Sequence, residues 1–246
     1  FEAWINDVAG KYGLDTRLLG PEEANQLAGA PSGTWAGGMY TQSDGRAEPF
    51  TAVPTIAAAL QQAGGLIRES CAVRTIETEG GCVSAVVTEH GRVRAQSVVC
   101  AAGGWSSLFL SNMGIRMPQL VVRGTVARTV ETPEFFSCAG VFEDICIRRR
   151  QDGGYTVATG FCEHFIGANS FRFLFNFIPS MGSATDMTVR LGRDATQQGF
   201  PAKSWGGDDT SPFETARVLN PKTSDKALRK MRKLLAEHIP QLADVA

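Results

Sequence analysis

One stretch of the sequence, SVVCAAGGWSSLF (Ser97–Phe109), places residues with little or no side chain directly after an apolar run. The run Val98–Ala101 is typical of a strand that is buried on both faces of a parallel sheet. Ala101, Ala102 and Gly103 would then lie at the carboxyl end of that strand, just before a helix. Ligands of open α/β sheets bind at such strand ends, often against a helix N-terminus. The sequence therefore predicts a ligand that comes close to the backbone here.

Common sequence motifs for metal binding, hydrolysis and phosphate binding do not occur in the sequence. His90 is predicted in a turn, His164 in a polar loop and His238 at a helix end, so we interpret all three as surface histidines rather than metal ligands. No G-x-S-x-G, Walker A or G-x-G-x-x-G pattern occurs. The six cysteines contain no C-x-x-C pair, which argues against a zinc site and against a disulfide framework. We interpret them as reduced thiols, several of them inside strands.

The overall charge excludes some partners. With 24 basic and 25 acidic residues, the chain has no global field to attract nucleic acid or an anionic membrane. The cluster Arg148–Arg150 is interpreted as a solvated strand end. No apolar run approaches the ~20 residues that span a bilayer, and no signal peptide is evident. We expect a cytoplasmic protein, and because residue 1 is Phe, a processed, truncated or partly represented chain.

The elements around the opening stretch predict an α/β piece from about residue 47 to 116. A helix over Pro54–Ala63 comes first and ends at two glycines. Turns at Gly80-Gly81 and His90-Gly91 then join three strands into an antiparallel meander, over 72–78, 82–88 and 92–95. This meander leads into the apolar run and into a helix over 105–112.

The flanking residues, 1–46 and 117–246, are predicted to form a second, mostly antiparallel β-rich domain with flanking helices, so the fold class is α/β (α+β). Strands are expected over 120–130, 145–150, 155–159 and 187–191, and the second and third of these are expected to form a hairpin about Asp152-Gly153. Phe171, Phe173, Phe175 and Phe177 recur at period two, which predicts another strand with an aromatic face. Residues 194–213 lack periodicity, so a mobile lid and plain disorder both remain open. An amphipathic helix is expected over 224–239.

Several motifs then follow one another in a fixed order: GGMYTQSDGRAEPFTAVPTIAAALQQAGG, CAVRTIETEGGCVSAVVTEHGRVRAQSVVCAAGGWSSLFLSNMGIRMP, VVRGTV and DGGYTVATG. This series resembles the D-amino-acid oxidase superfamily of FAD-dependent oxidoreductases, which includes glycine oxidase, sarcosine oxidase and D-amino-acid dehydrogenase. The family signature runs D-G-x-x-x-P, a helix ending A-x-x-x-G, V-x-x-I, a glycine turn, V-x-x-V-x-T-x-x-G and V-V-x-A-A-G-x-W-S. The sequence matches these elements over about residues 37–160, and LAEHIPQL resembles the family's later helix ending P-x-L.

The resemblance implies FAD as the cofactor and residues 47–116 as a partial FAD-binding domain. In this family the strand ending A-A-G-x-W-S passes beside the dinucleotide, so Ala101, Ala102 and Gly103 would supply backbone contacts. Trp105 stands where an aromatic residue packs near the cofactor, and Val73 matches the residue whose backbone meets the adenine. The alternatives are core packing for Val73 and Trp105, and a tight turn that needs glycine for Gly103.

The resemblance also implies the reaction. The family oxidises an amine or amino acid by hydride transfer from the carbon bearing nitrogen to the flavin, and water hydrolyses the resulting imine. The substrate would face the β-rich domain, where Arg123, Cys146 and Arg148 are the candidate contacts. Related oxidases carry a tyrosine near the position of Cys146. Each of the three has an alternative as an ordinary strand residue, and no catalytic acid or base is assigned.

Two family segments have no counterpart here: the opening strand, G-x-G-x-x-G and helix, and the closing glycine-bearing segment. We therefore expect this chain alone to bind FAD poorly, if at all. The leading hypothesis is a FAD-dependent oxidoreductase acting on the C–N bond of an amino acid or secondary amine. The alternatives are a non-catalytic fragment or subunit that needs a partner chain, and a redox-silent binding protein. Exposed apolar surface would favour association with a second copy or a complementing chain.

Overall fold

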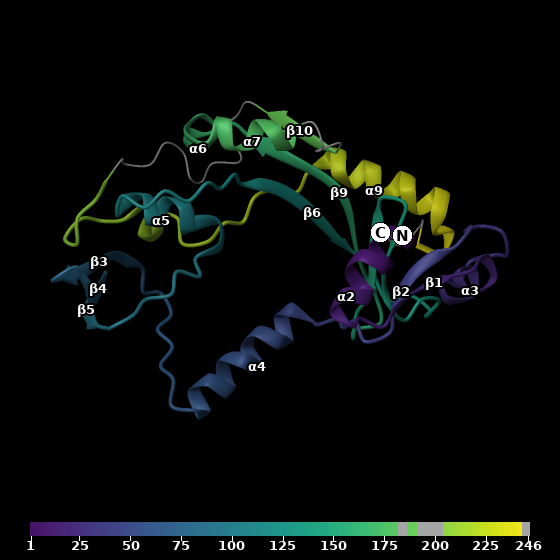
Figure 1. The fold of residues 1–246 in the computed structure, drawn as a ribbon, viewed down its shortest axis with the longest axis horizontal. Helices are drawn as coiled ribbons and strands as arrows, with labels where there is room; N and C mark the ends of the chain where they lie inside the picture. Colours follow the sequence, from purple (N-terminus) through teal and green to yellow (C-terminus); the bar gives the residue numbers. More distant parts are fainter. Residues whose placement is uncertain (182–185, 191–203, 243–246) are drawn as a thin grey trace. The chain divides into compact units, whose positions relative to one another are not determined.

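The computed structural model describes residues 1–181, 186–190 and 204–242, which divide into two compact units (Figure 1). The first unit consists of residues 1–64, 125–160 and 225–246, and the second of residues 65–124 and 161–224. Strands β6 (Val122–Arg128) and β9 (Tyr155–Phe165) contribute residues to both units. In the described residues no helix is both long enough and apolar enough to span a bilayer.

The N-terminal part of the first unit is a helical segment followed by a small hairpin-like sheet. α1 (Glu2–Trp4), a π-helical turn (Ile5–Ala9) and α2 (Gly10–Tyr12) run on without a break and end at Gly13, whose φ is 65°. β1 (Thr16–Leu19) pairs antiparallel with β2 (Gly38–Thr41), and α3 (Pro21–Leu27) lies between them in the chain. The buried Asn25 amide donates to the carbonyl oxygens of Pro21 and Trp35, which fixes the connecting loop.

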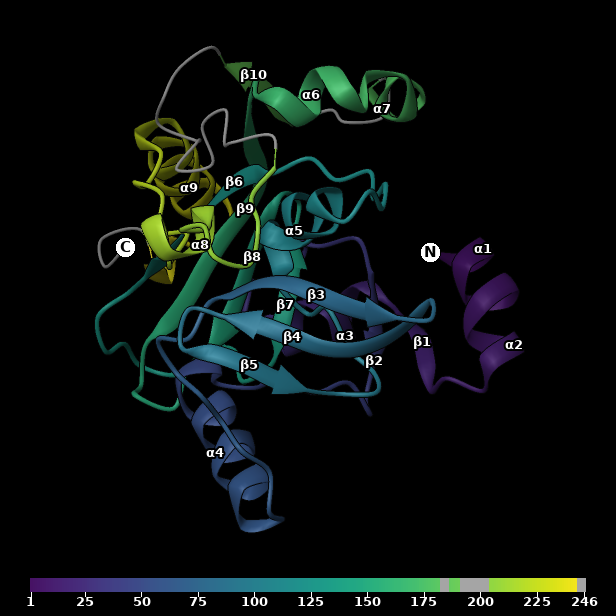
Figure 2. The same ribbon diagram turned by 90° about the vertical axis from the view of Figure 1, so that its left-hand side faces the viewer.

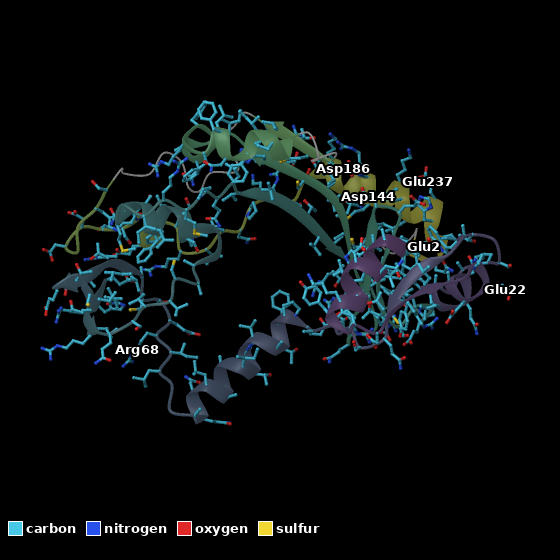
Figure 3. The ribbon with its side chains drawn as sticks, viewed as in Figure 1. Glu2, Glu22, Arg68, Asp144, Asp186 and Glu237 are labelled. Carbon is cyan, nitrogen blue, oxygen red and sulfur yellow. The ribbon has the colours of Figure 1, made fainter. Side chains whose placement is uncertain are left out.

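The core of the first unit is an antiparallel sheet covered by one helix. β7 (Ala139–Phe142), β8 (Ile145–Arg149) and the first half of β9 pair in that order, and β6 pairs with β9. Ile145, Ile147, Tyr155 and Val157 are buried from this sheet. α9 (Asp225–His238) packs on it through Ala227, Met231 and Leu235, as its periodicity predicts. Asp144, labelled in Figure 3, forms an ion pair with Lys230 of α9.

α4 (Pro49–Gln62) begins five residues before the predicted helix start. Pro49 occupies the first helical turn, where a missing N–H costs nothing, and Pro54 is accommodated farther in. The helix ends at Gly64, whose φ of 88° only glycine adopts without strain. Its side chains Phe50, Val53 and Ile56 are largely exposed.

The second unit contains the predicted meander. β3 (Val73–Glu79), β4 (Cys82–Thr88) and β5 (Gly91–Arg94) pair antiparallel in sequence order, which confirms the expected strands and turns (Figure 2). A 3₁₀ turn (Gly103–Trp105) leads into α5 (Ser106–Asn112), also near its predicted bounds. β10 (Met187–Arg190) pairs parallel with Cys162–Phe165 of β9, which confirms the expected strand there.

Two strand predictions differ from the structure. Val98–Ala101 is irregular backbone, and Val99 is 89% exposed, because no described residue pairs with this run as a buried parallel strand requires. The phenylalanine run is helical, forming α6 (Ala168–Arg172) and α7 (Leu174–Met181), so the predicted aromatic sheet face is wrong. Only Phe173 of that run is buried, and the helical turn starts where Gly167 N–H donates to Ser170 Oγ at 2.9 Å.

The segment without periodicity is packed where it is described. Trp205 is only 7% exposed, and its indole N–H donates to the Arg74 carbonyl oxygen at 2.7 Å. α8 (Pro212–Thr215) follows, and Glu214 pairs with both Nε and Nη2 of Arg74 at 2.9 Å. Residues 204–213 therefore belong to the folded second unit rather than to a lid or a disordered loop. Residues 194–203 lie outside the described residues.

Candidate active site

The backbone of the predicted cofactor stretch is open in the second unit. Ala101, Ala102 and Gly103 are all exposed. Gly103 has a φ of 53°, and a Cβ built there would meet nothing within 4 Å, so its conformation rather than crowding favours glycine. Its carbonyl oxygen accepts a hydrogen bond from Gln119 Nε2 at 3.0 Å, which holds the turn.

Trp105 and Val73 flank this stretch in different ways. The Trp105 ring packs edge-on against Phe213, with ring centroids 5.6 Å apart, and Trp205 contacts the same Phe213 ring at 5.5 Å. Trp105 therefore belongs to an aromatic cluster in this structure. Val73 opens β3 opposite Thr88, and Arg74 beside it is tied to Trp205. The cofactor candidates thus lie in one unit, and Trp105 is linked to β3 through Phe213, Trp205 and Arg74.

These residues fit part of a cradle for a dinucleotide. An extended cofactor needs exposed backbone with little side chain in the way, and Ala101–Gly103 offer that. Among the described residues, no group of three or more His, Cys, Asp or Glu could hold a metal ion. The exposed backbone of Ala101–Gly103 fits a cofactor that is held partly by backbone groups.

A cleft of about 520 Å³ lies in the first unit, between the start of α4 and the sheet. Its walls carry Arg128 of β6, Arg148 of β8 and Thr156 of β9, together with the apolar side chains of Phe50 and Val126. Thr129 N–H donates to the Tyr155 carbonyl oxygen at 2.9 Å, which sets Arg128 and Thr156 on adjoining strands. Of the predicted substrate contacts, only Arg148 lines this cleft.

Arg148 is held from three directions. Its Nη1 donates to the Ala47 carbonyl oxygen at 2.6 Å and to Glu48 Oε1 at 2.9 Å. Its Nη2 donates to Thr156 Oγ1 at 3.2 Å and reaches Glu48 Oε2 at 3.5 Å. The side chains of Arg148 and Glu48 are 21% and 19% exposed, so this ion pair remains open to the cleft. Sequence reasoning found Arg148 and missed Glu48, although Glu48 stands in the quoted DGRAEP motif.

The other two arginines of the cleft differ from each other. Arg150 is buried and donates to both carboxylate oxygens of Asp152 and to the carbonyl oxygens of Tyr155 and Thr129, so the solvated strand end is wrong for this residue. The hydrogen bond from Arg150 lowers the pKa of Asp152. The guanidinium of Arg128 is exposed and makes no hydrogen bond to the residues that the structure describes, although its charge also lowers the pKa of Asp152. Arg150 is thus structural, whereas Arg128 adds an exposed positive charge to the cleft.

Arg123 belongs to a buried ion pair in the second unit. Its Nε and Nη2 both donate to Glu163 Oε2, the former at 3.0 Å, and its guanidinium lies 4.7 Å from the Phe165 ring. Arg190 donates to the other Glu163 oxygen. Burial raises the pKa of Glu163, but hydrogen bonds from Arg123, Ser224 and Arg190 outweigh it and hold that pKa below its ordinary value. Two of the three guanidinium nitrogens of Arg123 are therefore engaged within the protein.

Cys146 and the histidines complete the sequence candidates. Cys146 lies on β8 two residues before Arg148, and burial together with the nearby Asp144 raises the pKa of its thiol, which disfavours a nucleophilic thiolate. His164 lies in β9 and is buried, so the surface interpretation is wrong for it. Its ring nitrogens are 2.9 Å from the Val121 carbonyl oxygen and from Ser170 Oγ.

Comparison with protein families gives one match that spans the chain. A family model described as FAD dependent oxidoreductase (DAO) matches residues 1–246. A D-amino acid dehydrogenase of Sinorhizobium medicae is 34% identical over 88 residues, covering 36% of this chain and 21% of that protein. Mitochondrial sarcosine dehydrogenase of Mus musculus is 31% identical over 113 residues, covering 44% of this chain and 12% of that protein. The matches thus span less than a third of these relatives.

Two solved structures are similar over nearly the whole chain. L-amino acid deaminase from Proteus vulgaris superposes with a TM-score of 0.89 at 24% identity, covering 100% of this chain and 58% of that chain. L-amino acid deaminase from Proteus myxofaciens, in complex with anthranilate, gives a TM-score of 0.89 at 30% identity, covering 99% and 56%. The chain spans a little over half the length of these two proteins.

Proposed function

The chain belongs to the DAO family of FAD-dependent oxidoreductases, and from that premise we propose that it oxidises the carbon–nitrogen bond of an amino acid. Secondary amino acids such as N-methyl amino acids are included in this proposal, since one similar protein is named a sarcosine dehydrogenase. Other similar proteins are named D-amino acid dehydrogenase and L-amino acid deaminase. A shared feature of these substrates is a free carboxylate beside the nitrogen.

The single observation that carries the proposal is Arg148 in the cleft. A guanidinium matches a carboxylate through parallel N–H donors, and partial burial strengthens that contact. The cleft holds three arginines against two acids, Glu48 and Asp152, so its net charge favours an anionic group. Phe50 and Val126 offer apolar surface to the rest of a substrate.

In the proposed mechanism the residues of this chain bind and orient the substrate and the cofactor. Arg148 would fix the substrate carboxylate, and the walls of the cleft would limit how the carbon bearing nitrogen is presented. The exposed backbone of Ala101, Ala102 and Gly103, with Val73 and Trp105 nearby, would contact FAD. When bound, FAD supplies the acceptor for the hydride that leaves this carbon. Cofactor contacts are assigned to residues 47–116, and substrate contacts mainly to 1–46 and 117–246.

The proposal is tested by the visible absorption of the purified full-length gene product. Oxidised flavin bands are expected, and they should bleach under anaerobic conditions when a reactive amino acid is added. The panel consists of D- and L-amino acids, N-methyl amino acids and the corresponding amines without a carboxylate. Bleaching by amino acids but not by the matched amines supports the proposal. A colourless protein, or bleaching by amines and amino acids alike, contradicts it.

A further inference from the structure

We propose that Glu48 binds the amino group of the substrate, so that Glu48 and Arg148 together select a free zwitterionic amino acid. The inference rests on the proposed function, because it places the substrate carboxylate on Arg148. It adds a specificity-determining residue and narrows the substrate class. Under it, N-acylated amino acids and amines without a carboxylate are poor ligands.

Glu48 stands at a helix start but does not serve the helix. It is the residue before Pro49 at the N-terminus of α4, a position from which a short polar side chain such as Asp accepts hydrogen bonds from the first-turn N–H groups. Its side chain makes no such bond. Its backbone carbonyl oxygen accepts from Ala52 N–H at 2.7 Å instead. The carboxylate is thus left for the cleft.

The geometry of the pair matches a zwitterion. In an amino acid the carboxylate and the ammonium group are attached to one carbon, so its receptor needs a cation and an anion side by side. Glu48 Oε1 and Arg148 Nη1 are 2.9 Å apart. The second contact, from Nη2 to Oε2, is 3.5 Å long and therefore weak, so this end of the pair can open to a ligand. An incoming carboxylate would take the Nη2 donor, and Glu48 would turn to the ammonium group.

The remaining charges of the cleft do not compete for the amino group. Asp152 is the only other acid that lines the cleft among the described residues, and it accepts two hydrogen bonds from Arg150 Nε, at 2.9 and 3.1 Å. Arg128 is a cation and would repel an ammonium group while helping to neutralise the carboxylate. Glu48 is therefore the carboxylate best placed to bind a substrate cation.

The opposing explanation is that Glu48 and Arg148 only anchor the start of α4 to β8. Both explanations predict some loss of stability when the pair is broken. They differ in ligand selectivity, because only direct contact with the amino group makes the effect of Glu48 depend on whether the ligand carries one. The test therefore compares ligands that differ by a single group.

The experiment is anaerobic calorimetric titration of the purified full-length holoprotein with DL-norleucine, hexanoate and pentylamine. The flavin is reduced with dithionite beforehand, so that norleucine binds without being oxidised. Hexanoate is norleucine without the amino group, and pentylamine is norleucine without the carboxylate. The variants are Glu48→Gln, Glu48→Asp, Arg148→Met and, as a matched control, Glu23→Gln, which removes a carboxylate paired with the exposed Arg17 outside the cleft. Thermal unfolding of each variant checks that it is folded.

The expected result is that Glu48→Gln weakens norleucine binding by about tenfold, the scale of one charge-assisted hydrogen bond, and leaves hexanoate binding unchanged or tighter. Glu48→Asp should recover part of the norleucine affinity, and Glu23→Gln should change neither ligand. Equal effects on norleucine and hexanoate, or none on either, overturn the inference while leaving the proposed function intact. Hexanoate binding that survives Arg148→Met contradicts the proposed function itself. If Glu48→Gln does not fold, the ratio of norleucine to hexanoate affinity in Glu48→Asp decides.

Discussion

Two arginine–glutamate pairs of this protein consist of the same residue types but serve different purposes. In the second unit, Glu163 is 1% exposed and is bonded by Arg123 and Arg190, so its oxygens are engaged. In the first unit, Glu48 and Arg148 are each about one-fifth exposed and share one good contact and one weak one. The two pairs differ in solvent access and in the number of arginines that bind the glutamate. A saturated pair stabilises the fold, whereas an unsaturated pair in a cleft has capacity left for a ligand.

Removing the saturated pair is expected to have the largest effect. Glu163→Gln leaves Arg123 buried without a full counter-charge, and we expect a loss of about 3 kcal/mol in the free energy of unfolding. Urea unfolding followed by circular dichroism measures it. Arg190→Gln is the matched control, since Arg190 is far more exposed and should cost clearly less. Equal losses in the two variants would mean that burial of the arginine does not set how much its ion pair with Glu163 stabilises the protein.

Breaking the Arg148–Glu48 pair of the cleft should weaken ligand binding strongly and lower stability only slightly. Arg148→Met is expected to lower the affinity for hexanoate by at least tenfold while changing the free energy of unfolding by under about 1 kcal/mol. Calorimetry and urea unfolding on the same preparation give the two values. A large loss of stability with unchanged affinity would mean that the cleft pair is structural like Arg123–Glu163.

A sequence reveals features whose contacting residues lie close together in the chain better than features that join distant residues. Turn glycines and periodicity predicted the meander, the hairpin around Asp152-Gly153 and α9, because these features are local. The run Val98–Ala101 and the phenylalanine run were predicted wrongly as strands, because neither a continuous apolar run nor a period-two pattern shows whether a neighbouring strand exists. Arg148 was found through its place in a familiar motif order.

The partners of the candidate arginines were not found from the sequence. Glu48 lies 100 residues before Arg148, and Glu163 lies 40 residues after Arg123. Neither acid has a local signal that separates it from a surface acid, since burial and partners arise only on folding. The roles of Ala101, Ala102, Gly103, Val73 and Trp105 toward FAD stay predictions.

A third ion pair, between Arg74 and Glu214, makes the stability of the protein depend on pH. The hydrogen bond from Arg74 lowers the pKa of Glu214 to about 2, well under its unfolded value of 4.5. A depressed pKa adds stability above pH 4.5, and that stability is lost as the pH falls from 4.5 toward 2. We therefore expect Glu214→Gln to unfold at a lower temperature than the native protein at pH 7, with the gap closing near pH 2. A gap that persists unchanged in acid would assign the effect to packing.

The smallest effect is expected at the exposed pair of the first unit. Arg17 and Glu23 are each about half exposed, so solvent screens their attraction despite two short contacts. Glu23→Gln should leave the melting temperature and the ligand affinities within experimental error. A measurable change would show that exposure alone does not rank these pairs.

The role of Arg148 is measured by anaerobic bleaching of the flavin in the full-length native protein and in its Arg148→Met variant, each titrated with the same reactive amino acid. The expected result is that both proteins carry oxidised flavin, and that half-bleaching of the variant needs at least tenfold more amino acid. Flavin that bleaches at the same concentration in both proteins, or a native protein that binds no flavin, would contradict it.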